Sequence, residues 1–369
     1  MVRFVHAADF QIGKPYNWAN DRAQKTLQER REQAIERVGE VAEEKNADFI
    51  VVAGDFFDAN TIEDDVITRA CRRLSSVDVP VYILPGNHDF AAGPACVYER
   101  STFERHQPDH VTILDTETPQ VVADGEAVLL PAPIRRRNEL GDPTSHFDSD
   151  LGYEEAPKAV RIGVAHGGVV DFEGGEASSR IDPGRVEAAE LDYLALGDWH
   201  GKKQIRDRVW YCGTPEPDSF KQNDPGYVLH VEIEESGADP AVEPVETAQT
   251  RWLRKEVDIR QEEDLVAFRD WFEDLADPLN ALVRLELRGR LGLEAISSLE
   301  DLLDDLENTV LHLRRRGDGV RPKASPDEID AIATDGYVRT AVERLKAEAE
   351  DGEESAEEAL QLLYQLKRE

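Results

Sequence analysis

Short apolar segments alternate with longer, mostly polar segments over the first part of the chain. Residues 22–45 carry Ile35, Val38 and Val41 at helical spacing and predict a long charged helix, and residues 62–74 predict a second helix. The apolar segments are too short for helices and predict buried strands. Strands that alternate with helices in this way indicate an α/β fold with layered sheets. The predicted strands are residues 2–7, 49–53, 81–84, 128–130, 162–165, 193–196, 209–212 and 227–231.

The pattern changes after residue 232 and indicates separate domains. Residues 233–250 are acidic, contain two prolines and lack apolar periodicity, which predicts a linker. Beyond the linker, the pattern predicts a small α+β domain over residues 251–322, followed by a helical C-terminal segment over residues 323–369. Within the α+β domain, residues 282–287 and 310–313 predict strands and residues 299–306 predict an amphipathic helix.

The last predicted helix, residues 356–367, has an apolar face formed by Ala359, Leu360, Leu363 and Leu366. Such a face either docks on a partner or packs back on the chain's own C-terminal part. The sequence leaves both possibilities open.

The charge is unusual, because the formal net charge is −34 and only 11 of the 43 basic residues are lysines. The acidic residues are spread along the whole chain rather than gathered in a tail. This composition is typical of proteins from salt-loving organisms and predicts a haloarchaeal origin, the alternative being an ordinary acidic protein. In such a protein, overall acidity is weak evidence against a nucleic-acid substrate.

Three cysteines without a C-x-x-C pair argue against a disulfide scaffold and against a zinc ribbon. The N-terminal residues show no basic region followed by an apolar run, so we expect no signal peptide. Apolar runs remain far shorter than the roughly 18 residues of a membrane span. We therefore expect a soluble, cytoplasmic protein with no membrane partner.

Polar residues follow the carboxyl end of five predicted strands, often beside glycines that let the backbone turn sharply. Because ligands bind beyond the carboxyl ends of strands in open sheets, these residues are expected to converge on one pocket. They are Asp9 and Gln11, Asp55 and Asp58, Asn87 and His88, His166, and Asp198 and His200.

The chemical types of these residues indicate a metal centre. Carboxylate, amide oxygen and imidazole without thiolate suit a divalent ion such as Mn²⁺ better than structural zinc. The candidates are too many for one ion and suit two ions that share a bridging carboxylate. Two metal ions about 3.5–4 Å apart form the arrangement that hydrolyses phosphoesters.

The order of the motifs D-x-Q, GDxxD, GNHD, HGG and GDxH resembles the calcineurin-like metallophosphoesterase superfamily. Within it, the segments HAADFQIG, VVAGDFFD, ILPGNHD, VAHGG, YLALGDWH and YCGTPEP resemble SbcD-type DNA repair exonucleases, in the branch paired with an SMC-like ATPase. The resemblance covers residues 1–232, the expected metallophosphoesterase domain, and extends more loosely to a cap domain. It implies a four-layer α/β/β/α sandwich with a smaller α+β cap domain and a helical C-terminus.

The resemblance also implies a role for each motif residue and two divalent ions, with Mn²⁺ as the expected metal. Asp55 would bridge the two ions. His88 would protonate the leaving oxygen, and Asp58 would orient His88. The first ion would be held by Asp9, Gln11, Asp55 and His200, and the second by Asp55, Asn87, His166 and Asp198.

Two positions depart from the common family pattern. Gln11 and Asp198 both stand where the family usually has histidine. Gln11 offers only a neutral oxygen, whereas Asp198 adds negative charge to the second position. Each ion would therefore lose at most one imidazole.

The resemblance implies a DNA exonuclease or hairpin endonuclease that acts in double-strand break repair, as a homodimer with a coiled-coil SMC-like ATPase. Two alternatives remain: a nucleotidase or other small-substrate phosphoesterase, and a non-catalytic scaffold that binds DNA ends. Three basic runs are further candidates for phosphate contacts, although a basic run is usually a solvated face. They are residues 135–137, 202–203 and 314–316.

Overall fold

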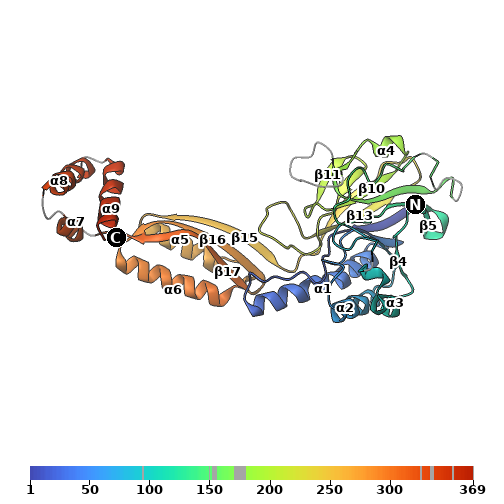
Figure 1. The fold of residues 1–369 in the computed structure, drawn as a ribbon, viewed down its shortest axis with the longest axis horizontal. Helices are drawn as coiled ribbons and strands as arrows, with labels where there is room; N and C mark the ends of the chain where they lie inside the picture. The colour runs from blue at the N-terminus through green and yellow to red at the C-terminus, as the bar shows by residue number, and fades with distance from the viewer. Residues whose placement is uncertain are drawn as a thin grey trace. The chain divides into compact units, whose positions relative to one another are not determined.

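The structure is a computed structural model. It describes residues 1–369 apart from 94, 149, 152–155, 170–179, 325, 333–335, 351–352 and 369. The chain forms two compact units, Met1–Arg251 and Trp252–Glu369 (Figure 1).

The first unit contains two six-stranded sheets, with strand orders β14-β13-β1-β2-β3-β4 and β11-β12-β10-β7-β6-β5. The first sheet consists of β1 (Val2–Ala7), β2 (Phe49–Ala53), β3 (Val81–Leu84), β4 (Val111–Ile113), β13 (Tyr227–Ile233) and β14 (Ala241–Glu246). The second consists of β5 (Gln120–Val122), β6 (Ala127–Ala132), β7 (Val160–His166), β10 (Tyr193–Gly197), β11 (Lys203–Arg206) and β12 (Val209–Tyr211). Strands β1 to β4 are parallel to one another, as are β6, β7, β10 and β12.

Helices and short elements complete this unit. They are α1 (Asp21–Glu44), α2 (Asp64–Leu74), α3 (Ser101–His106), α4 (Arg185–Ala188), the 3₁₀ turns Val97–Glu99 and Ala123–Gly125, and the short strands β8 (Gly168–Val169) and β9 (Arg180–Ile181).

The two sheets pack face to face, because alternate side chains of one strand reach opposite cores. Phe4 of β1 stacks on Phe49 with ring centroids 5.4 Å apart and contacts Tyr193 of the second sheet at 5.5 Å. Val5 and Ile50 lie on the other face, in the core that also contains apolar residues of α1 and α2. Burial on both faces explains the continuous apolar strands in the sequence.

The outer face of the second sheet is covered more thinly, by the short helix α4 and by loop residues such as Phe147 and Leu191. The layers are therefore helix, sheet, sheet and a thin helical layer. The expected α/β/β/α sandwich is confirmed.

The linker interpretation of residues 233–250 is wrong for part of the segment. Residues Ala241–Glu246 form β14, an edge strand that pairs antiparallel with β13. Pro244 is tolerated because edge strands place unpaired backbone groups outward. Within β14, Val242 and Val245 are half-buried and the other residues are exposed. The acidic sequence of this strand therefore gives little periodic signal.

The second unit begins with a three-stranded sheet in the order β15-β16-β17. Val283, Leu285 and Leu287 of the central strand pack in one core with Leu302 and Leu306 of a helix. Helix residues 299–306 were predicted, but the first strand and first helix were not, since charged residues interrupt their apolar pattern. The elements are β15 (Arg251–Ile259), α5 (Glu262–Glu273), a 3₁₀ turn (Pro278–Asn280), β16 (Ala281–Leu291), α6 (Leu293–Thr309) and β17 (His312–Pro322).

Three helices end the chain: α7 (Pro326–Ile332), α8 (Gly336–Glu350) and α9 (Glu354–Arg368). Leu360 of α9 is 4 % exposed and packs with Val342 and Ile329, while Leu366 is 63 % exposed. Leu360 and Leu363 of the apolar face predicted over residues 356–367 therefore pack back in one core with residues of α7 and α8. Among the residues that the structure describes, no helix is both long and apolar enough to cross a membrane.

Candidate metal centre

All nine predicted site residues lie at the carboxyl ends of parallel strands. Because β1, β2 and β3 are neighbours in one sheet and β7 and β10 are neighbours in the other, these ends meet along one edge of the sandwich. The residues are Asp9 and Gln11 after β1, Asp55 and Asp58 after β2, Asn87 and His88 after β3, His166 at the end of β7, and Asp198 and His200 after β10.

Asp9, Asp55 and His166 form the centre of this arrangement. Their ligand atoms all lie within 4.8 Å of one another, and the three residues are at most 2 % exposed. His166 Nε2 lies 3.5 Å from Asp55 Oδ2. Two carboxylates buried together are costly unless a cation compensates them, so the cluster has the composition and burial of a cation site.

The neighbourhood of Asn87 supports this interpretation. Its side-chain oxygen lies 3.0 Å from His166 Nε2, and the same atom lies 3.2 and 3.1 Å from the two Asp55 oxygens. Acceptor atoms at such distances repel unless a donor or a cation lies among them. A half-turn of the amide would place its nitrogen there as a donor, whereas a divalent cation would hold the oxygen inward. The donor set therefore fits a hard or borderline divalent ion.

The orientation of His166 is also that of a metal ligand. Its Nδ1 lies 2.9 Å from the carbonyl oxygen of Ala53, which can only accept, so Nδ1 carries a proton and donates it. Burial by itself lowers the pKa of His166, but the Asp55 carboxylate raises it well above the usual range. The second ring proton and a metal ion compete for the same position, Nε2.

The two buried carboxylates differ in their titration. Burial raises the pKa of Asp9 to about 6. Burial also acts to raise the pKa of Asp55, but the neighbouring His166 and His88 outweigh this effect and lower the pKa to about 2. Asp55 is therefore ionised at neutral pH and is the stronger anchor for a cation.

The backbone at the site is strained in a way that aims these side chains. Asp9, Gln11, Asp55 and Asp198 have φ values of 55°, 45°, 52° and 97°. Positive φ is uncommon outside glycine, and strained residues of this kind cluster at functional sites. Gly86 permits the close approach, because a Cβ there would lie 2.2 Å from Asp55 Oδ1.

His88 lies beside this cluster and is turned by Asp58 and Asp55. Its backbone N–H donates to Asp55 Oδ1 at 2.9 Å, and its ring Nδ1 lies 2.7 Å from the Asp58 carbonyl oxygen. The Asp58 carboxylate is farther from the ring, 3.9 Å from Nδ1. Asp58 therefore orients His88 through its main chain, which leaves Nε2 free to face a substrate.

Asp89, the residue after His88, fixes the turn that carries it. Its carboxylate accepts from the backbone N–H groups of Gly86 and Phe57 and from the Tyr98 hydroxyl, at 2.7, 3.0 and 2.5 Å. It is fully buried, and its role in the turn is structural.

Lys14 and Asp218 were not among the predicted site residues, yet both contact the predicted ligands. Lys14 Nζ donates to Gln11 Oε1 at 2.5 Å and to Asp218 Oδ2 at 2.6 Å. His200 Nδ1 donates to the same Asp218 oxygen at 2.9 Å, and its Nε2 lies 3.4 Å from Gln11 Nε2. The oxygen of Gln11 is thus bound by an ammonium group. The only sequence signal was proximity, since Asp218 directly follows the YCGTPEP segment.

The negative charge of Asp218 is balanced by the basic side chains around it. Burial acts to raise the pKa of Asp218, but His200, Lys14 and Arg31 hold it well below its usual range. Burial acts to lower the pKa of His200, and Asp218 raises it. An ionised Asp218 fixes the Nδ1 proton of His200, which leaves the lone pair of Nε2 available for a cation.

Asp218→Asn is expected to weaken cation binding by about 10- to 100-fold, because second-layer partners of ligating histidines have effects of this size. Calorimetric titration with Mn²⁺ measures the change. Asp224→Asn, a nearby variant that removes only a surface pair with Lys202, is the matched control. Equal affinities in the two variants would show that Asp218 does not position His200.

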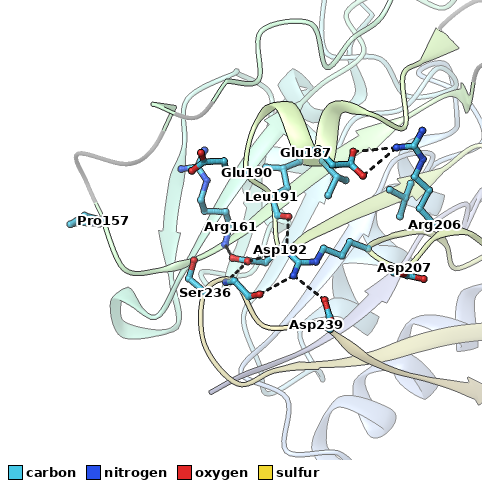
Figure 2. Close-up of a pocket in the computed structure, with 14 residues that line it drawn as sticks. Pro157, Arg161, Glu187, Glu190, Leu191, Asp192, Arg206, Asp207, Ser236 and Asp239 are labelled. Atoms are coloured by element: carbon cyan, nitrogen blue, oxygen red, sulfur yellow. Dashed lines mark hydrogen bonds and ion pairs between the residues drawn. The ribbon is translucent and has the colours of Figure 1, made fainter.

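A concave region lies away from this edge, at the starting ends of β7, β10 and β12 (Figure 2). It is a cavity of about 740 Å³ with several arginines. Arg206 pairs with Glu187 at 3.2 Å, and Arg208 pairs with Asp239 at 2.9 Å. Arg161 donates to backbone carbonyls. Much of the positive charge that lines the cavity is therefore used in contacts within the protein.

Sequence comparison defines the class of protein to which this centre belongs. Residues 2–231 match the calcineurin-like phosphoesterase family, and the chain belongs to that family. The family typically binds two divalent metal ions, which agrees with the Asp9, Asp55 and His166 cluster.

The individual proteins to which the chain is similar have low sequence identity to it. The chain is 24 % identical over 309 residues to the uncharacterized metallophosphoesterase YhaO of Bacillus subtilis strain 168, covering 78 % of this chain and 72 % of that protein. Among solved structures, it is similar to TT1561 of Thermus thermophilus, with 13 % identity and a TM-score of 0.42, over 67 % of this chain and 99 % of the other.

Proposed function

We propose that the chain is a two-metal phosphodiesterase that hydrolyses DNA. The observation that carries this proposal is the buried cluster of Asp9, Asp55 and His166, with the Asn87 side-chain amide directed at it. The order and the residues of the strand-end motifs support DNA rather than a free nucleotide as substrate. The segments ALGDWH and YCGTPEP are the strongest support.

Two divalent ions, with Mn²⁺ as the proposed metal, fit the residues around Asp55. Bound there, the ions would neutralise charge that develops on the phosphoryl group and would activate a water molecule for attack. The second ion should bind more tightly than the first. The reason is that Gln11 belongs to the first site and its side-chain oxygen already accepts a hydrogen bond from Lys14. Asp9, Asp55, His200 and Gln11 would hold the first ion, and Asp55, Asn87, His166 and Asp198 the second.

His88 is the proposed general acid. The Asp58 carbonyl accepts from Nδ1, so Nε2 is the atom that holds the transferable proton. In the reaction, an oxygen from water bonds to phosphorus and the bond to the sugar oxygen breaks. The Nε2 proton goes to that departing oxygen.

The resemblance to SbcD-type nucleases supports two partners for this activity. A coiled-coil SMC-like ATPase would open or deliver DNA ends, and a second copy of the chain would complete a homodimer. A double-strand break is the DNA structure that such a complex would process.

The test is an assay of the full chain with Mn²⁺ on linear duplex, hairpin and single-stranded DNA, beside a 5′-mononucleotide. We expect cleavage of at least one DNA substrate, its loss in EDTA, and no release of phosphate from the mononucleotide. Efficient mononucleotide hydrolysis with intact DNA would make the chain a nucleotidase and contradict the proposal.

The salt dependence of this activity is expected to be unusual. A net charge of −34 with few lysines supports a halophilic origin, in which high salt screens the repulsion between carboxylates. Hydrolysis of a small phosphodiester, measured from about 0.1 to 3 M KCl, should therefore rise to a maximum in the molar range. A steady fall with salt, while circular dichroism shows an unchanged fold, would contradict the halophilic origin.

A further inference from the structure

The three-stranded sheet of the second unit has two chemically different faces. Val283, Leu285 and Leu287 pack into the core with α5 and α6. Because side chains alternate across a strand, the residues between them lie on the other face. Arginines occupy most of those positions on β16 and β17. We call this set the arginine face: Arg284, Arg288, Arg290, Arg314, Arg316 and Arg321.

The strand register brings these arginines together. Arg284 lies beside Arg314, and Arg290 lies beside Arg321, on the parallel pair of β16 and β17. Val320 and Leu291 pack in the helix-side core, which places the arginines next to them on the opposite face. The arginine face thus forms a row that runs along two long strands rather than a pocket.

In the described part of the chain, Glu286 is an acidic neighbour of this row. Glu286 accepts from Arg284 at 2.7 Å and also lies 3.5 Å from Arg254 of β15. Among the described residues, no ion pair involves Arg288, Arg290 or Arg316. In a chain with a net charge of −34, such an excess of positive charge on one face is an exception.

The guanidinium group of Arg284 is incompletely hydrogen-bonded, and its neighbours carry like charge. Burial, together with the neighbouring Arg316 and Arg284, lowers the pKa of Arg314. The Nε atom of Arg284 is buried and has no hydrogen-bond partner in the described part of the chain. Neighbouring like charges repel one another, and an anion placed between them relieves that repulsion.

We propose that the arginine face binds the phosphate backbone of nucleic acid, an inference that rests on the proposed function. Guanidinium groups bind phosphate through two parallel hydrogen bonds. Residues on one face of a parallel strand repeat about every 6.6 Å, so the row matches an extended polyanion better than a single small anion. A nucleic-acid backbone carries closely spaced charges along its whole length.

Two matched double variants test the proposal on the full chain. Arg288→Gln with Arg316→Gln removes two exposed charges from the arginine face without leaving a paired carboxylate behind. The control, Arg269→Gln with Arg315→Gln, removes the same charge on the helix side. Arg269 lies on α5, and Arg315 lies on β17 within 3.3 Å of Glu307 of α6. None of the four residues belongs to the metal centre.

The probe is a fluorescein-labelled 30-base-pair duplex in EDTA, which prevents hydrolysis, with anisotropy measured over a series of salt concentrations. We expect the Arg288/Arg316 variant to bind about tenfold more weakly or worse, and the control to bind within about twofold of the wild type. The slope of log affinity against log salt should become shallower by about 1.8, since each lost phosphate contact contributes about 0.9.

Further measurements separate this proposal from the proposed function. Hydrolysis of bis(p-nitrophenyl) phosphate with Mn²⁺ reports on the metal centre alone and should be equal in wild type and both variants. If wild type does not hydrolyse it while the binding loss holds, the proposed function fails and the arginine face stands. Equal DNA binding by both variants, with native circular dichroism spectra, would overturn the inference. Loss of self-association in light scattering, without loss of DNA binding, would assign the face to a second copy and also overturn it.

Discussion

Asp55→Asn is expected to abolish detectable phosphodiester hydrolysis and to weaken cation binding throughout the site. Asp55 is 2 % exposed and its pKa is lowered to about 2, so it supplies the fixed negative charge at the centre. Metal ions contribute several kcal/mol to the transition state, and each 1.36 kcal/mol is a factor of ten, so the rate should fall by about 1,000-fold or more. The rate of bis(p-nitrophenyl) phosphate hydrolysis and calorimetric Mn²⁺ titration measure both effects.

The matched control is Asp124→Asn, which makes the same change at an exposed residue of a surface turn. It should leave both the rate and Mn²⁺ binding unchanged. Retained hydrolysis in Asp55→Asn would place the reaction elsewhere in the protein.

His88→Ala is expected to reduce DNA hydrolysis by about 100- to 10,000-fold, the usual contribution of a general acid, while leaving the metal content intact. The physical reason is that His88 Nε2 faces the cluster, 3.9 Å from Asp55 Oδ2, where the proposed mechanism has it protonate the leaving group rather than bind an ion. Elemental analysis after dialysis against Mn²⁺ measures the metal content.

The choice of leaving group sharpens this test. p-Nitrophenolate departs without a proton, so His88→Ala should impair bis(p-nitrophenyl) phosphate hydrolysis much less than DNA hydrolysis. An equal loss on both substrates, or the loss of bound metal, would show that His88 acts as a ligand or a structural residue.

The place of the site was predictable from the sequence because of the parallel strands. Residues such as Asp9, Asp55 and His166 each follow an apolar segment, and parallel strands end at one edge. The residues could therefore be placed at one edge of the sheets from the sequence, without knowledge of the loops, and the structure has them at the ends of those strands. The individual ligand roles assigned to them remain predictions.

The contacts behind the ligands were not predictable in this way. Asp218 meets His200 and Lys14 only because separate loops after β1, β10 and β12 fold toward one another. No local sequence pattern predicts such contacts between residues that are far apart in the chain. Strands β14 and β15 were missed for a different reason, since an exposed edge or a charged face removes the apolar alternation on which strand prediction depends.

The metal centre itself is tested most directly by anomalous scattering from crystals of the full chain grown or soaked with Mn²⁺. We expect two peaks about 3.5–4 Å apart, both within coordinating distance of Asp55. The peak between Asn87 and His166 should be the stronger at limiting Mn²⁺, because Lys14 occupies the oxygen of Gln11. The absence of any peak among Asp9, Asp55 and His166 at saturating Mn²⁺ would contradict the assignment of a metal-dependent centre to this cluster.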